Sequence, residues 1–144
     1  PTQISNILET LYKQQTDFLE PDLEKLFSAV RNRITQRSLL IFFTNYETFS
    51  SLERDLPCLK MLNKNHLLLL VFFENTELKQ VLESKVHSVE EVYRKTIAEK
   101  FIFEKRLIVK ELQKQGITSI LTTPQNLTAN TLNKYLEIKA RQML

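Results

Sequence analysis

Two uninterrupted runs of apolar residues limit what this chain can fold into more than any other feature. The runs are Leu39–Phe43 and Leu67–Phe73. Neither alternates with polar residues, so each predicts a strand buried on both faces, as in the interior of a parallel sheet. They stop at the polar pairs Thr44-Asn45 and Glu74-Asn75. Ligands of open α/β sheets bind beyond the carboxyl ends of the strands, so these pairs mark the candidate functional end.

Segments with helical periodicity surround the two strands. We expect helices over residues 4–14, from Pro21 to about 37, over 49–64, after Asn75, from about 89 to 115, and from about 126 onward. Pro57 is expected to break or shift the third of these helices. The pattern Ser88-Val-Glu-Glu91 is typical of a capping box that opens the long fifth helix. That helix is apolar around much of its circumference, so we expect it to be covered on more than one side.

A third, shorter strand is expected between the last two helices. Gly116, the only glycine, stands where a left-handed C-cap belongs, and Ile117 to Thr123 then form a more polar strand that Pro124 ends. Strands separated by helices predict a parallel α/β sheet with helices on both faces. We therefore expect one domain over 1–144, a three-layer sandwich with a parallel sheet of about three strands: two helices in 1–36, the sheet with its crossover helices in 37–124, and a C-terminal helix in 125–144.

The composition excludes several classes of site. A single glycine in 144 residues leaves no P-loop and no dinucleotide-binding fingerprint, since both need glycines for close backbone approach to phosphate. The lone Cys58 cannot form an intramolecular disulfide, and the histidines have no zinc-ligand spacing. No signal peptide or membrane-spanning run is visible. We expect no cofactor and a cytoplasmic location for this segment.

Polar residues after the three strands form the candidate binding rim at the carboxyl end of the sheet. Its members are Thr44, Asn45, Tyr46, Glu74, Asn75, Thr122 and Thr123. Helix capping or loop solvation explains each residue taken singly. We therefore interpret the rim as a whole, and no single member of it, as a protein-binding surface.

Part of the sequence resembles a known bacterial family. The segment 37–45 resembles its "R-S-L-hydrophobic-run-T-D" motif, and the strand at His66–Phe73 is similar to its "R-H-L-hydrophobic-run". The C-terminal segment 126–141, which contains Asn-Lys-Tyr-Leu-Glu-Ile-Lys-Ala-Arg, is similar to its closing "N-x-Y-L-E-L-K-A-R" helix. The family, domain of unknown function fifty-eight, has a von Willebrand factor A-like domain and is often encoded beside MoxR-type AAA+ ATPases.

The resemblance implies that this chain is the C-terminal half of such a domain. Strands preceding Pro1 would then cover the free side of Leu39–Phe43, and a longer parent could be anchored in the inner membrane. The Asp-x-Ser-x-Ser loop of the family's metal site is missing here. Asn45 replaces its aspartate, and only Thr16 lies near the position of its threonine. Amide oxygens are weaker Mg²⁺ ligands than carboxylates, so we expect a degenerate site without metal. Asp17 and Asp22 are better explained by capping and solvation.

Three functions are compatible with these patterns. The leading one is a non-enzymatic protein-interaction module, for which the resemblance implies a MoxR-type AAA+ ATPase as partner. Self-association through Leu39–Phe43 is a further expectation. The second is a hydrolase or phosphoacceptor, although Asn45 lacks the carboxylate that a phosphoacceptor needs. The third is weak nucleic-acid binding through the basic helix 94–114. Its seven Lys or Arg are interleaved with three Glu, as on a solvated face, so we expect no nucleic-acid partner.

Overall fold

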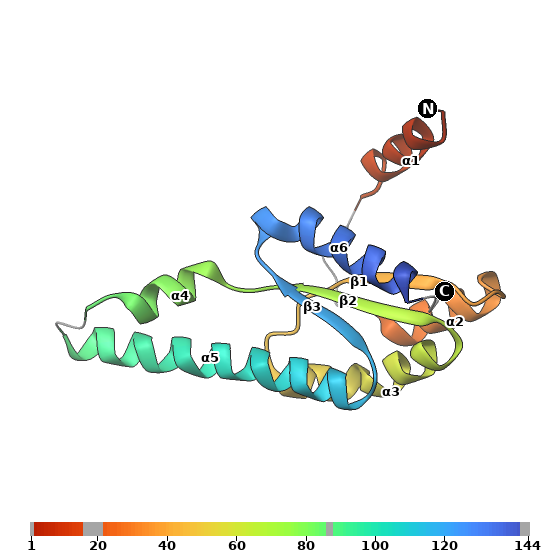
Figure 1. Cartoon of the computed structure of the whole chain (residues 1–144). Coiled ribbons are helices and arrows are strands. Elements are labelled where there is room, and N and C mark those ends of the chain that lie inside the picture. Colours follow the sequence, from red (N-terminus) through yellow and green to blue (C-terminus); the bar gives the residue numbers. More distant parts are fainter. Residues whose placement is uncertain (1, 16–21, 86–87, 142–144) are drawn as a thin grey trace.

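A three-stranded parallel sheet forms the centre of the molecule (Figure 1). The computed structural model describes residues 2–15, 22–85 and 88–141. The elements are α1 (Thr2–Tyr12), α2 (Leu23–Arg33), β1 (Leu39–Phe43), α3 (Phe49–Asn65), β2 (Leu67–Phe73), α4 (Thr76–Glu83), α5 (Val89–Lys114), β3 (Thr118–Thr122), the 3₁₀ turn η1 (Pro124–Asn126) and α6 (Leu127–Ala140). The strands lie in the order β1-β2-β3 and are all parallel. The predicted fold class, a small α/β sandwich, is confirmed.

Helices cover both faces of the sheet (Figure 1). On one face, Leu70 and Phe72 of β2 pack into a core with apolar side chains of α2, α3 and α5. On the other face, Leu69 and Val71 pack against α6 through Ile138. Side chains alternate between the two faces along a strand, so an uninterrupted apolar run is what a strand covered on both sides requires.

β2 is the central strand, whereas β1 lies at an edge. Residues 68–72 of β2 have no exposed surface. Within the described sheet, β1 pairs with β2 alone, and its Ile41 and Phe43 are 38% and 60% exposed. Both residues point to the α6 side, because they are in register with Leu69 and Val71. The sequence-based expectation of an interior strand therefore does not hold for β1 among the described residues.

α3 runs without a break through Pro57, contrary to the predicted interruption. An interior proline removes one helical hydrogen bond and costs about 3 kcal/mol. The helix nevertheless continues, because Leu52, Leu59 and Leu62 lie on one stripe and are 0–1% exposed in the core. Burial of three leucines contributes more than the proline costs.

α5 begins and ends as predicted, but its first half is less covered than expected. Both reciprocal bonds of the capping box between Ser88 and Glu91 are present, and Gly116 after the helix has a positive φ of 68°. In the N-terminal half, Val92 and Tyr93 are 51% and 68% exposed. Only the later part of the helix lies over the sheet. α4 and the start of α5 project beyond it as a two-helix arm (Figure 1).

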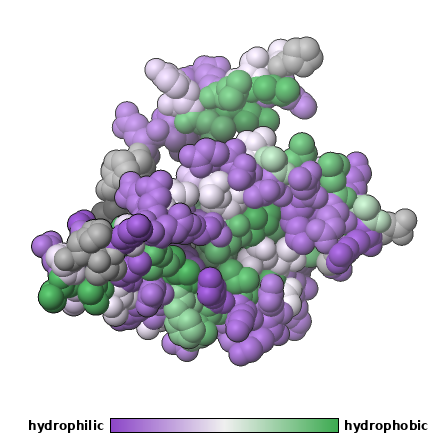
Figure 2. Space-filling model, turned by 60° about the vertical axis from the view of Figure 1, so that its left-hand side comes forward, coloured by the Kyte–Doolittle hydropathy of each residue, from purple (hydrophilic) through white to green (hydrophobic). Residues whose placement is uncertain are grey.

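α1 has an apolar stripe that no described part of the chain covers. Ile4, Ile7, Leu8 and Leu11 are each at least 59% exposed. Figure 1 shows the helix standing apart from the sandwich, and Figure 2 shows its apolar side as green surface at the top. The stability of the sandwich therefore comes from the elements that follow α1.

Shortening a side chain of β2 should destabilise the fold strongly. We expect Leu70→Ala to lower the free energy of unfolding by roughly 2–5 kcal/mol, because it leaves a cavity at a residue with no exposed surface. Leu132→Ala, on the outer side of α6 at a residue that is 53% exposed, should change it by no more than about 0.5 kcal/mol. Urea denaturation of the two variants measures both values, and equal losses would contradict the assigned core.

Candidate functional site

A cleft with a volume of about 590 Å³ opens at the carboxyl ends of the strands. It lies between these strand ends, α4 and the middle of α5. The apolar part of its lining comprises Phe73, Leu78, Phe101, Ile102, Leu121 and Pro124. The charged and amide residues of its lining are Asn45, Glu47, Glu74, Asn75, Glu77, Lys79, Lys105 and Arg106. Figure 2, which brings this side of the molecule forward, shows apolar surface bordered by polar side chains. The volume is typical of small-ligand sites.

The parallel sheet brings the predicted strand-end residues to the same edge. The backbone N–H of Thr44 donates to the Val71 carbonyl at 3.0 Å, and that of Glu74 donates to the Thr122 carbonyl at 2.9 Å. These bonds continue the ladder for one residue beyond each strand and align the segments that follow. Asn45 and Glu74, two members of the rim expected from the sequence, consequently both line the cleft.

Lys105 lines the cleft, and the sequence pattern did not predict this position for it. It comes from α5, its Nζ donates a hydrogen bond to Asn45 Oδ1, and it lies 5.6 Å from the centre of the Phe72 ring. Burial lowers its pKa, and the nearby Glu47 opposes this effect. No ion pair joins Lys105 to a carboxylate in the part of the chain that the structure describes. It is thus a partly desolvated cation with a neutral partner.

A signal for Lys105 was present in the sequence. It lies seven residues after Ala98 and seven before Leu112, and both of these residues are fully buried. A lysine on the buried stripe of a helix is unusual, because desolvating the ammonium group costs free energy. Its spacing from these two residues separates Lys105 from the solvated charges of 94–114.

Two other rim residues have structural partners within the cleft. Glu74 forms an ion pair with Lys79 from α4. Asn75 caps α4, where its Oδ1 accepts from the backbone N–H groups of Glu77 and Leu78 at 3.0 and 3.2 Å. The cap satisfies donors at the start of α4, as the sequence pattern predicted for this asparagine.

The remaining rim residues lie outside this cleft. Tyr46 is buried in the core, where burial and, next, the Asp55 carboxylate raise the pKa of its hydroxyl. Thr122 is buried as well, and its Oγ1 accepts from Asn130 Nδ2 at 2.7 Å. Thr123 is half-buried at the start of the 3₁₀ turn. Burial makes Tyr46 and Thr122 parts of the scaffold of the rim.

A second hollow of about 600 Å³ lies beside the end of β1. Its lining includes Phe43, Thr44 and Tyr46 from this end of β1, together with Leu26 of α2 and Arg54 of α3. Asn45 and Glu47 line both hollows, so the segment that follows β1 separates them. The exposed Phe43 ring therefore adjoins both the open strand edge and the rim.

The described residues do not fit the divalent metal site that the resemblance implies. They contain no group of three or more His, Cys, Asp or Glu side chains placed to hold a metal ion. Asn45 Oδ1, at the position of the family's aspartate, accepts a hydrogen bond from the Lys105 ammonium. Asp22 caps α2 by accepting from the Lys25 N–H at 3.0 Å. Thr16 and Asp17 lie outside the described residues.

The groups considered for catalysis lie away from the cleft. Cys58 is half-buried in α3, where burial raises the pKa of its thiol. His66 is buried at the opposite, amino end of β2. Neither residue lines either hollow. His87 lies outside the described residues.

Comparisons with known proteins give no match. No family model matches the chain, and no curated protein and no solved structure matches it significantly. No helix of the described residues is long and apolar enough to cross a membrane.

The buried Tyr46 predicts a loss of stability at high pH. An unfolded tyrosine loses its proton near pH 10, whereas folded Tyr46 keeps it to higher pH. The contribution of Tyr46 to the free energy of unfolding is therefore complete below about pH 10. Above that pH it falls by up to about 1.4 kcal/mol per pH unit. We expect Tyr46→Phe to flatten the decline of unfolding free energy between pH 9 and 11, which urea titrations measure. Tyr93→Phe, at a residue that is 68% exposed, should leave the slope unchanged. Equal slopes in all three proteins would contradict this assignment.

Magnesium should not stabilise this chain. A ligand that binds only the folded state raises the melting temperature, and the described residues do not present a set of carboxylates for the ion. We expect differential scanning fluorimetry to give the same melting temperature with millimolar MgCl₂ as with NaCl of matched ionic strength. A clear rise specific to Mg²⁺ would show that a metal site exists.

Proposed function

We propose that this chain is a non-enzymatic protein-interaction module that binds its partner through the open edge of β1 and the adjoining rim. The observation that carries the proposal is the exposure of Ile41 and Phe43 on a strand that, among the described residues, pairs on one side only. The unpaired edge of an apolar strand presents both backbone hydrogen-bonding groups and hydrophobic surface. Both features favour the addition of a strand from another protein.

The geometry supports protein binding more than catalysis. Phe43 adjoins the second hollow, so an added segment would continue onto the rim at Thr44 and Asn45. Nucleophilic catalysis requires a nucleophile beside an oriented base, and neither hollow includes Cys58 or His66 in its lining.

The sequence resemblance suggests which partner to test first. Its motifs are those of proteins encoded beside MoxR-type AAA+ ATPases, so we propose such an ATPase as the partner. A second copy of the chain is the competing partner, because an open strand edge can also pair with itself.

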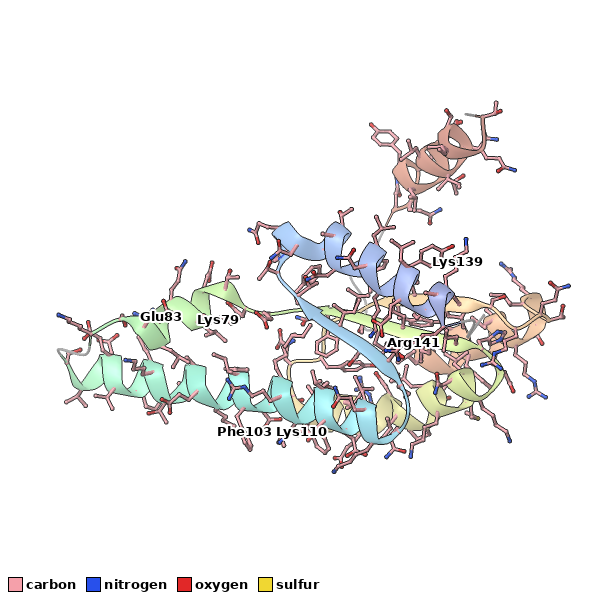
Figure 3. All side chains as sticks on the ribbon, in the orientation of Figure 1. Lys79, Glu83, Phe103, Lys110, Lys139 and Arg141 are labelled. Atoms are coloured by element: carbon pink, nitrogen blue, oxygen red, sulfur yellow. The ribbon has the colours of Figure 1, made fainter. Side chains whose placement is uncertain are left out.

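Phe43→Lys should weaken binding of a MoxR-type AAA+ ATPase, the partner proposed above. We expect the dissociation constant to rise at least about tenfold, because a central apolar contact is lost and a charge is introduced at the edge. Phe103→Lys is the matched control: Phe103 is 59% exposed against 60% for Phe43, and it points away from the sheet (Figure 3). Biolayer interferometry measures both variants.

Sedimentation of the chain alone distinguishes the two partners. Association of the wild-type chain that Phe43→Lys abolishes and Phe103→Lys preserves would identify a second copy as the partner. The interaction proposal fails if the wild type neither binds the ATPase nor associates, or if the two variants behave alike in both measurements.

A further inference from the structure

We propose that the cleft between the carboxyl ends of the strands, α4 and α5 is a binding site for a carboxylate carried on an apolar body, with Lys105 and Asn45 holding the carboxylate. This inference goes beyond the strand-edge interaction and does not depend on it. The ligand could be a free small organic acid or an acidic residue flanked by apolar residues in a protein. The two sources share one chemistry, which the cleft would recognise in the same way.

The partial desolvation of Lys105 favours a bound anion. An ammonium group has three donors, and the structure gives one of them to Asn45 Oδ1 and places the group near the Phe72 ring. Burying a cation without a carboxylate partner costs free energy, so such a group gains from a bound anion more than a fully hydrated lysine does. Its lowered pKa is consistent with this desolvation.

The side-chain amide of Asn45 supplies further hydrogen-bond donors. Its Oδ1 is oriented toward Lys105, so its Nδ2 carries two N–H donors on the other branch of the same group. A carboxylate has two acceptor oxygens, and it could accept from Lys105 Nζ with one and from Asn45 Nδ2 with the other. Neutral and charged donors placed together in this way favour a monoanion.

The lining of the cleft fits a monocarboxylate on an apolar body. Phe73, Phe101 and Leu121 form an apolar wall. The charged part of the lining contains three carboxylates and three cations, and one of each, Glu74 and Lys79, are paired with each other. A monocarboxylate would add one negative charge to this lining, whereas a dianionic phosphate would add two. The apolar wall then accommodates the rest of the ligand. The α4 N–H groups next to the cleft are already capped by Asn75, so they do not supply the anion site.

Hydrocinnamate is a suitable probe, with hydrocinnamide as its neutral control. We expect titration of the ¹⁵N-labelled chain with hydrocinnamate to shift the amide signals of cleft residues, including the Asn45 side chain. Hydrocinnamide should bind at least about tenfold more weakly, because it lacks the charge-assisted hydrogen bond. Equal binding of the two probes, or no binding of hydrocinnamate to the folded wild type, would overturn the proposal.

Two substitutions test the assigned residues, and each changes the site in a different way. Lys105→Met removes the charge and keeps an apolar side chain of similar length, while Asn45→Asp keeps the lysine but supplies it with an internal carboxylate. Both should weaken hydrocinnamate binding at least about tenfold. Lys110→Met is the control, because Lys110 is an exposed lysine on the same helix that points away from the sheet (Figure 3).

The dispersion of the amide spectrum shows whether each variant is folded. Wild-type affinity in folded Lys105→Met or Asn45→Asp would refute the assigned residues, and the same loss in Lys110→Met would refute the location.

A blocked Leu-Glu-Phe peptide and its Leu-Gln-Phe analogue then distinguish the two possible sources of the carboxylate. Tighter binding of the glutamate peptide than of hydrocinnamate supports an acidic residue of a protein, and binding of hydrocinnamate alone supports a free acid.

Discussion

The burial of β2 between two helical layers is the interaction on which the rest of the structure depends. Each of its central residues has no exposed surface, and both neighbouring strands pair with it. α3 and α5 pack on the side of Leu70 and Phe72, and α6 packs on the side of Leu69 and Val71. The hydrophobic effect scales with the apolar area removed from water, so this one strand organises most of the favourable burial. Elements without contact to its layers, such as α1 and the tip of the α4–α5 arm, are exposed.

The same core explains the character of the cleft. α5 carries Ile108 and Leu112 into the core, and one and two turns earlier the same helix borders the cleft. Lys105 is therefore held at the boundary, where its ammonium group lies near the Phe72 ring and donates a hydrogen bond to Asn45. A position between core and solvent leaves a cation partly desolvated but accessible. A binding site needs this combination, because full hydration would weaken the contact with an anion and full burial would prevent access.

Features encoded by local residues were predictable from the sequence, whereas those that depend on tertiary contacts were not. The strands, the Ser88 capping box, the Asn75 cap and the left-handed Gly116 each follow from a short pattern. The continuity of α3 through Pro57 follows instead from burial of its leucines on β2, which no local pattern contains. In the candidate site, the placement of Asn45 and Glu74 could be derived from strand ends in a parallel sheet. The contact of Lys105 with Asn45 required knowing that α5 packs beside the segment that follows β1, and the burial of Tyr46 required the packing around it.

The order of the strands in the sheet is the same as their order in the chain. Each strand adds to the outer edge left by the one before it, and no strand has to enter between two others. During synthesis, β2 can therefore pair with β1 before β3 has been made, and α3 can cover the growing sheet at that stage. The face that Leu69 and Val71 share must wait for α6, the last described helix, so that side of the sheet is the last to leave water. The sheet is thus suited to assembly from the N-terminal side toward the C-terminal side.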